Sequence, residues 1–338
     1  MALLEESGEL DARVLRPLAS RYLAFISHAF NQTNHRFRNF MSYSRAWLEE
    51  VGSEDSQGRT LWALGTVIGR STDPGRQSLA LELFHAARAP VSAFTSPRAW
   101  AYTLLGIQEY LRAFDGHREV QELRASLALR LFELHGRTSD TSWPWFEAHL
   151  TYANARLSQA MLVSGEALKN DAMTAVGPSS LEWLFTLQTT GAGHFAPVGS
   201  NGFFQRGEPM AEFDQQPVEA CAMISSCLDA FRVTGEPKWL QRARKTFGWF
   251  FGRNHLHQPL YDARSGGCRD ALHSDRVNEN QGAESTLSFL LSLQEMRLAE
   301  RASTHRAGVE SADAITSPGL DPAPRPSAPL AARAESPQ

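Results

Sequence analysis

The chain has 338 residues, of which 42% are hydrophobic and 21% charged, and its formal net charge is −4. A chain of this length and composition forms one large globular domain or two ordinary ones. It has no basic stripe of the kind that binds nucleic acid, and no apolar run approaches the ~18 residues of a membrane helix. We therefore expect neither a nucleic-acid partner nor a membrane partner.

The N-terminus, "MALLEESGELDARV", is acidic and lacks the basic-then-apolar run of a signal peptide. The three cysteines are odd in number and show no C-x-x-C spacing. A disulfide framework is therefore not expected, and a reducing compartment is the simpler interpretation. Together these features predict a cytoplasmic protein.

Helical periodicity dominates from about Leu10 to Ala299. The first segment, "LDARVLRPLASRYLAFISHAF", places its apolar residues three and four apart along one stripe. Later segments alternate between two types. Some, such as "REVQELRASLALRLFELHG" and "KWLQRARKTFGWFFGRN", are amphipathic, whereas others are apolar or small nearly all round after a polar start. The second type comprises residues 61–69, 99–107, 148–165, 217–231 and 284–293.

A helix that is apolar on every side must be buried on every side. Alternation of buried and half-buried helices predicts an all-α toroid, in which an inner ring of helices is wrapped by an outer ring. Five buried helices are clear, and we expect a sixth within "NFMSYSRAWLEE", residues 39–50. The predicted fold class is therefore an (α/α)6 toroid.

The connections and the C-terminus complete this prediction. Loops that lead into the buried helices are long and polar, so we expect them to gather at one end of the ring. Within one of them, "GHFAPVG" and "GFFQRG" (193–199 and 202–207) suggest a short hairpin. The Pro-, Ala- and Ser-rich end is too polar to form a core. We expect a toroid domain at 1–302 and a disordered tail at 303–338.

Polar residues are concentrated where the buried helices begin. If these helices run parallel around a ring, their starts converge on one mouth, and the polar and aromatic side chains there can bind the hydroxyls and the apolar face of a sugar. The candidate substrate-binding residues are Asp55, Arg59, Trp143, Trp145, His149, Gln215, Gln216, Asn280, Gln281 and Glu284.

Three carboxylates at these starts are candidates for catalysis, with Asp214 and Glu279 first and Glu147 next. Glycoside cleavage typically uses two carboxyl groups, one as acid and one as base or nucleophile. An aromatic neighbourhood would raise the pKa of at least one of them, as a general acid requires.

Each candidate has a purely structural alternative. Asp55, Asp214 and Glu279 suit helix caps or first turns. The two candidate tryptophans suit packing on the core, and His149 suits a buried, hydrogen-bonded position. No residues have metal-ligand spacing, so we expect no metal and no cofactor. Capping does not explain the surplus of polar side chains in "DQQPVEA" and "NENQGAES".

With "WPWFE" and "DQQPVEA" at helix starts and a closing "NENQGAEST", the chain resembles the six-hairpin (α/α)6 glycosidase-like superfamily over about residues 10–299. Similar segments occur in helical domains associated with bacterial glycosyltransferases and mannosyltransferases. The resemblance implies a mono- or oligosaccharide ligand and a glycosyltransferase as a possible partner. The chain itself has no G-x-G-x-x-G motif and no strand–helix alternation, so it lacks a nucleotide-sugar-binding half.

Three functions remain open. The first is a glycoside hydrolase-like enzyme, in which two carboxyl groups would lie ~5 to 9.5 Å apart. The second is an N-acylglucosamine epimerase-like isomerase, in which two histidines would face each other. Histidines available for that role are His149, His194, His255 and His257. The third is a non-catalytic sugar-binding or scaffold domain, which needs neither arrangement.

Overall fold

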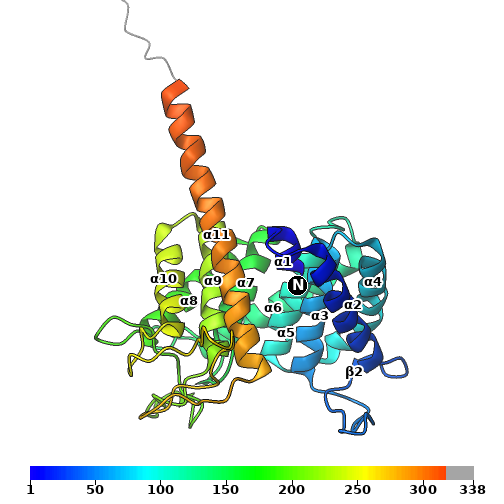
Figure 1. The fold of residues 1–338 in the computed structure, drawn as a ribbon, viewed down its shortest axis with the longest axis horizontal. Coiled ribbons are helices and arrows are strands. Elements are labelled where there is room, and N and C mark those ends of the chain that lie inside the picture. Colours follow the sequence, from blue (N-terminus) through cyan, green and yellow to red (C-terminus); the bar gives the residue numbers. More distant parts are fainter. Residues whose placement is uncertain (317–338) are drawn as a thin grey trace, which may run out of the picture. The chain divides into compact units, whose positions relative to one another are not determined.

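The computed structural model describes residues 1–316, with side chains as far as residue 303. Met1–Leu298 form one compact unit, and Ala299–Gln338 belong to a second. The first unit is an α/α toroid, as predicted, with outer and inner helices alternating along the chain (Figure 1). The outer helices are α2 (Ala12–Ala29), α4 (Pro74–Ala87), α6 (Arg118–Thr138), α8 (Asp171–Leu187) and α10 (Pro237–Phe247). The inner helices are α3 (Glu54–Arg70), α5 (Pro97–Tyr110), α7 (Ala155–Ala167), α9 (Pro217–Thr234) and α11 (Ala283–Thr316).

Burial separates the two sets as the sequence predicts. Nearly every residue of α5 and α7 is buried, whereas α6 buries only one stripe. The inner helices also approach closely, because a Cβ on Gly65 of α3 would lie 2.1 Å from the carbonyl oxygen of Gly106 in α5. Glycine at both positions therefore allows backbone contact between these two helices.

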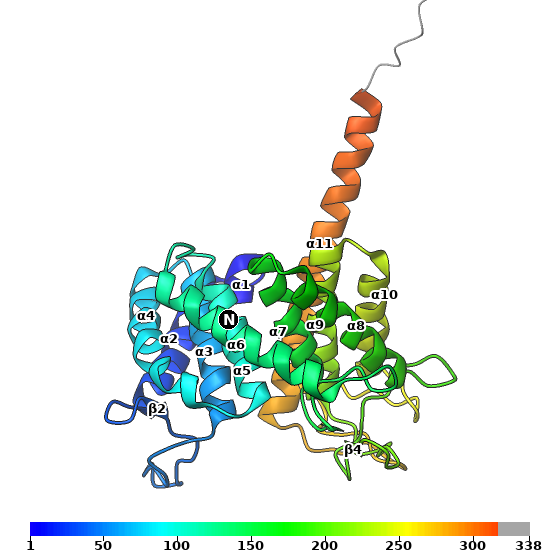
Figure 2. The ribbon, with the colours of Figure 1, turned by 180° about the vertical axis from the view of Figure 1, so that it is seen from behind.

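Connections are short from each inner helix to the next outer one and long from outer to inner. The short ones include residues 71–73 and 168–170, and the long ones include 188–216 and 251–282. The long loops lie together at the lower end of the ring, the end at which the inner helices begin (Figures 1 and 2). The inner helices therefore run parallel to one another, and all of them begin at the same end of the ring.

Three small helical elements and two short strand pairs complete the toroid. α1 (Ala2–Ser7) precedes α2, and the 3-10 turns η1 (Ala89–Ala93) and η2 (Gly248–Phe250) follow α4 and α10. β1 (Phe30–Asn31) pairs with β2 (Arg36–Phe37), and β3 (His149–Leu150) pairs with β4 (Phe204–Gln205). The predicted hairpin of 193–199 with 202–207 is therefore wrong, because its second half pairs with β3 instead.

The sixth buried helix, expected at 39–50, is also absent from the described residues. This segment is irregular, with one isolated bridge between Met41 and Trp47. The hydroxyl of Ser42 accepts from the N–H of Ala46 over 3.0 Å, and the Glu49 carboxylate accepts from the N–H of Phe40 over 3.2 Å. Side chains that bond to the local backbone in this way compete with a helix. The part of the chain that the structure describes thus contains five inner helices.

The C-terminal region differs in part from the prediction. α11 continues to Thr316, so the first residues of the predicted disordered tail, 303–316, are helical. They contain Ala, Glu and Arg, which favour a helix, and the first proline after Ala299 is Pro318. Residues 317–338 lie outside the described residues. None of the described helices combines the length and the apolarity needed to cross a membrane.

Candidate functional site

The first turns of α3 place a charged pair at the end where the inner helices begin. Asp55 and Arg59 are one turn apart and form a salt bridge, with Nε and Oδ2 2.6 Å apart. The hydroxyl of Tyr152, from the loop before α7, donates to the other Asp55 oxygen over 3.2 Å. The Arg59 guanidinium lies over the ring of Tyr102 on α5, 4.4 Å from its centroid.

A second arginine, Arg98 of α5, extends this set of polar contacts. Arg98, which is 4% exposed, donates through Nε to the carbonyl of Tyr152 over 2.6 Å. Its Nη1 donates to the Glu147 carboxylate over 2.6 Å, and Nη2 to the Asn154 side chain over 3.2 Å. His149 lies 3.5 Å from the other Glu147 oxygen. We call Asp55, Arg59, Arg98, Glu147 and Tyr152 the ring network.

Electrostatic effects connect further inner helices to the ring network. Burial raises the pKa of Tyr102 to about 12, against the opposing charges of Arg59 and Arg156. Burial alone would lower the pKa of Arg59, but Tyr102, Asp55 and Glu284 of α11 raise it. Glu284 therefore lies close enough to Arg59 for its charge to act on it.

Glu219 of α9 also forms hydrogen bonds at this end of the ring. Its carboxylate accepts from the N–H of Ala153 and from the side chain of Asn154, the latter over 3.0 Å. Burial raises the pKa of Glu219, and these hydrogen bonds oppose the rise. The starts of α3, α5, α7 and α9 are thus joined by polar contacts.

Trp62 is an aromatic residue beside the ring network that the sequence analysis missed. It is partly exposed and stacks on Tyr102 with ring centroids 5.8 Å apart. Its position three residues after Arg59, on the same face of one helix, was the available signal. Tyr102 likewise lies four residues after Arg98 on one face of α5, so the same signal was available for it.

The predicted role of Trp143 and Trp145 in sugar stacking is wrong. Their exposed fractions are 4% and 0%. Both rings pack against Trp183 of α8, with centroids 5.0 and 5.7 Å away. These rings belong to the core, so the structural alternative holds for both. Glu147 lies in the same loop rather than on a helix, because α7 begins only at Ala155.

Of the two amides that precede α9, Gln215 has a structural role. Gln215 is fully buried, and its Oε1 accepts from the Trp249 indole over 3.0 Å. Its backbone exchanges two hydrogen bonds with Leu272. These contacts leave Gln215 with no surface for a ligand, which contradicts its predicted binding role. Gln216 is the N-cap residue of α9, and its side chain makes no capping bond.

The polar surplus of "NENQG" is used within the loop of residues 262–282. Asn280 donates to Asp270, and Gln281 bonds to Asp262 over 3.2 Å. Glu279, whose side chain is 75% exposed, pairs with Arg269 over 3.0 Å. These side chains hold the loop together. The surplus therefore has an internal explanation that the sequence could not reveal, since the partners are up to nineteen residues away.

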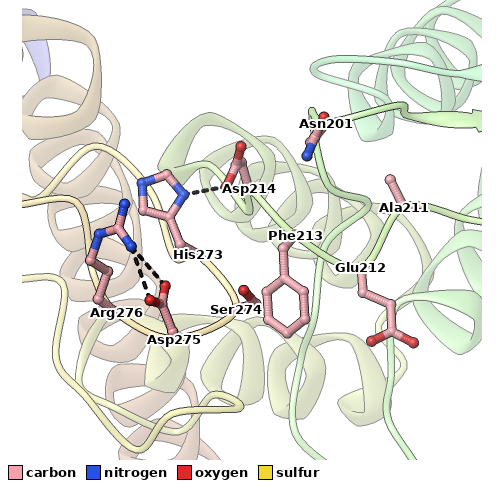
Figure 3. Close-up of a pocket in the computed structure, with 9 residues that line it drawn as sticks. All are labelled: Asn201, Ala211, Glu212, Phe213, Asp214, His273, Ser274, Asp275 and Arg276. Atoms are coloured by element: carbon pink, nitrogen blue, oxygen red, sulfur yellow. Dashed lines mark hydrogen bonds and ion pairs between the residues drawn. The ribbon is translucent and has the colours of Figure 1, made fainter.

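Asp214 lies in a pocket of about 420 Å³, the Asp214 pocket. Its carboxylate bonds to Nδ1 of His273, and the other ring nitrogen points away from Asp214, towards the side of Arg276 (Figure 3). The pocket is lined by Asn201, Ala211, Glu212, Phe213, Asp214, His273, Ser274, Asp275 and Arg276. Glu279 is not among these residues, so the structure does not bring it into the pocket with Asp214.

Neither candidate aspartate is a helix cap, although Asp55 lies in the first turn of α3, as the structural alternative allows. Ser53 caps α3 by accepting from the N–H of Ser56, so Asp55 is not the cap. Asp214 precedes the N-cap residue of α9 by two positions. Both carboxylates instead bond to side chains from other parts of the chain, Tyr152 and His273.

Two histidines face each other near the start of α9. The rings of His194 and His255 are 4.8 Å apart and nearly perpendicular. Burial lowers the pKa of His194, and the charges of His255 and His257 lower it further. His255 also bonds to Gln215 over 3.2 Å. Within the described residues, no group of three or more His, Cys, Asp or Glu could hold a metal ion.

No protein-family model matches the chain, and no curated protein matches it. Solved structures do match. The cellobiose 2-epimerase of Spirochaeta thermophila aligns with a TM-score of 0.62 at 14% identity, over 89% of this chain and 84% of that one. The chain shares the fold of six-hairpin glycosidase-like proteins. A D-mannose isomerase gives a TM-score of 0.62 at 11% identity, over 88% and 84% of the two chains.

A mannosidase of glycoside hydrolase family 76 from Bacteroides thetaiotaomicron gives a TM-score of 0.56 at 9% identity, over 87% and 84% of the two chains. These matches include both a hydrolase and isomerising enzymes. At such identities they establish the fold alone.

Proposed function

We propose that this chain is a carbohydrate-active protein that binds a mono- or oligosaccharide where its inner helices begin. The observation that carries the proposal is the convergence of two pairs of candidates from distant parts of the sequence, Asp55 with Arg59 and Glu147 with His149, in and beside one network. Sugar-acting enzymes among the solved structures of similar fold support it.

The chemistry of this end of the ring suits a pyranose. Trp62 is partly exposed, and its ring, which Tyr102 and Arg156 also contact, supplies an aromatic surface for the apolar side of the sugar. Beside it, the Asp55 carboxylate accepts from hydroxyls and the Arg59 guanidinium donates to them. Because their mutual salt bridge already orients both groups, little conformational entropy is lost on binding.

For the reaction, we propose glycoside hydrolase-like cleavage with Asp214 as one carboxyl group. The Asp214 pocket also contains the carboxylate of Glu212, which we take as the second group that hydrolysis needs, because the Asp275 carboxylate is already paired with Arg276. Glu147 is less suited to proton transfer, because Arg98 holds it in an ion pair. Glu279 is less suited because it is exposed and lies outside the pocket.

A sugar isomerase is the second candidate, and a specific contact favours it. His273 is held at Nδ1 by Asp214, which leaves Nε2 to take a proton from a substrate. Removal of a proton from the carbon beside the carbonyl of an open-chain sugar, its return to the former carbonyl carbon, and transfer of the adjacent hydroxyl proton to the former carbonyl oxygen isomerise the sugar without water. Asp214 then orients His273 rather than acting on the glycosidic oxygen.

A thermal-shift screen against mono- and disaccharides tests the binding proposal. Wild type and Trp47→Leu, which removes another partly exposed tryptophan, are expected to be stabilised by the same sugars, whereas Trp62→Leu is not. No stabilisation of wild type, or equal stabilisation of all three proteins, would refute binding at Trp62.

Product analysis with Asp214→Asn and His273→Gln separates the reactions. Disaccharide cleavage that is lost in Asp214→Asn and retained in His273→Gln identifies a hydrolase. Interconversion of monosaccharides that is lost in both variants identifies an isomerase. Stabilisation by sugar without any product contradicts both and leaves a sugar-binding domain, for which a glycosyltransferase is the partner to test by co-purification.

A further inference from the structure

Arg156, on the first turn of the inner helix α7, differs from the other arginines of the ring. It is only 3% exposed. Its Nη1 donates to the Gln159 side chain over 2.7 Å, and its Nη2 contacts the sulfur of Cys221 at 3.6 Å. Its guanidinium lies over the ring of Trp62, 4.7 Å from the centroid. Among the described residues no carboxylate lies within 4.0 Å of it, whereas Arg59 and Arg98 each have one.

A buried guanidinium without a counter-ion is costly, and buried charges are normally paired. Gln159 and Cys221 are neutral partners, because burial raises the pKa of the Cys221 thiol. The aromatic face of Trp62 offsets part of the cost through a cation–π contact. Arg156 therefore keeps a charge that an anion from outside the chain can neutralise.

Glu295 of α11 is an acidic group that interacts electrostatically with Arg156. Its carboxyl group accepts a hydrogen bond from Ser225 of α9. Burial raises the pKa of Glu295 to about 7. Arg156 and the Ser225 hydrogen bond oppose this rise, Asp229 adds to it, and Arg70 opposes it. Glu295 therefore holds its proton to a higher pH than an ordinary carboxyl group, and among the described residues it forms no ion pair with Arg156.

We propose that Arg156 is the subsite for the carboxylate of an acidic sugar, a uronate, whose ring packs on Trp62. A carboxylate accepts two parallel N–H bonds from a guanidinium, which gives the subsite its preference for this group. Protonated Glu295 donates a further hydrogen bond to the same carboxylate. Trp62 and Glu295 both keep part of their exposure, so the surroundings of Arg156 are not sealed. This inference rests on the proposed sugar-binding function and specifies its substrate class.

The subsite makes binding depend on pH in one direction. Below pH 7 Glu295 is protonated and donates to the ligand. Above pH 7 it loses its proton, repels the ligand carboxylate and competes with it for the charge of Arg156. A uronate should therefore bind with uptake of a proton, and its affinity should fall by up to about tenfold per pH unit above 7.

Titration calorimetry with D-glucuronate and D-glucose, which differ only at C6, tests this inference on the full chain. At pH 6 we expect wild type to bind D-glucuronate at least about tenfold more tightly than D-glucose, the equivalent of ~1.4 kcal/mol. At pH 8.5 we expect that preference to shrink to less than about threefold. Equal affinity for the two sugars at pH 6 overturns the inference and leaves the proposed function intact. Absence of binding by both sugars refutes both.

Three variants sharpen the test. Arg156→Gln should abolish the preference for D-glucuronate while D-glucose still binds, and Glu295→Gln, which cannot ionise, should keep the preference at pH 8.5. Arg232→Gln is the matched control, since Arg232 lies exposed on α9 and pairs with Glu166. If Arg156→Gln fails to fold, as judged by circular dichroism, Glu295→Gln alone decides. Loss of the preference at pH 8.5 in Glu295→Gln contradicts the role of Glu295.

Discussion

The ring network and the 262–282 loop contain similar side chains but use them differently. Both regions are rich in carboxylates and in their hydrogen-bonding partners. The loop precedes α11, whereas the ring network lies on α3, on α5 and in the loop before α7. In the loop, Asn280 and Gln281 bond to aspartates of the same loop. In the ring network, Asp55 bonds to a side chain 97 residues away, and Arg98 to one 49 residues away.

The difference shows that polar surplus in a sequence does not by itself identify a site. Hydrogen bonds inside one loop satisfy its polar groups and leave little for a ligand. Groups contributed by several helices are held at fixed positions, and Trp62 lies beside them with part of its surface exposed. The following predictions test this distinction, and they are ordered by the size of the expected effect.

Arg98→Met should give the largest loss of stability. It would leave the Glu147 carboxylate, whose side chain is 11% exposed, with His149 as its nearest remaining side-chain partner. Removal of one partner from a buried pair costs about 3 to 5 kcal/mol, which urea unfolding would detect. Arg206→Met is the control, because Arg206 and Asp140 form an exposed pair worth less than about 1 kcal/mol. Similar losses in both variants would contradict the special role of the ring network.

Glu295→Gln should change the pH dependence of stability. The folded pKa of about 7 lies above the unfolded value of 4.5. The contribution of Glu295 to the wild-type free energy of unfolding should therefore be largest below pH 4.5. It should decline by about 3 kcal/mol as pH rises through 7. Thermal unfolding at pH 5 and pH 8.5 should show that decline in wild type and not in the variant.

Glu182 of the outer helix α8 should give a pH dependence of stability opposite to that of Glu295. Its hydrogen bond from Arg242 and the charges of Arg242 and Lys238 lower its pKa. This group therefore stabilises the fold above its unfolded pKa, and the contribution disappears as pH falls through the lower folded value. Glu182→Gln should be less stable than wild type at pH 7 and equal to it at low pH. A variant as stable as wild type at both values would show that the ion pair contributes nothing.

Asn280→Ala should have a smaller effect, confined to the loop. It removes the hydrogen bond to Asp270, and a single exposed bond of this kind contributes about 1 kcal/mol. Sugar affinity should not change, because the bond holds the loop rather than a ligand. A loss of sugar affinity in calorimetry, with unfolding unchanged, would return Asn280 to the candidate binding residues.

The fold was predictable from sequence where periodicity determined burial. All-apolar segments such as 99–107 and 217–231 are inner helices, because a helix without a polar face has no stable place at the surface. Segment 39–50 was misassigned, because the bonds of Ser42 and Glu49 to local backbone override its helical spacing. The site was predictable for Asp55 and Arg59, whose helix and position were both evident. It was not predictable for Arg156, since its lack of a counter-ion depends on residues far away in sequence.

Glu279→Gln should have the smallest effect. The Glu279 side chain is 75% exposed and its one charged partner is Arg269, so water and salt screen the pair to less than about 1 kcal/mol. If Glu279 were a catalytic carboxyl group, the same change would abolish turnover of any saccharide that the chain processes while leaving stability unchanged. Parallel measurement of unfolding and of product formation, beside Asp214→Asn, distinguishes the two cases. We expect turnover to be lost in Asp214→Asn and retained in Glu279→Gln, because Asp214 lines a pocket with His273 whereas Glu279 bonds only within its loop.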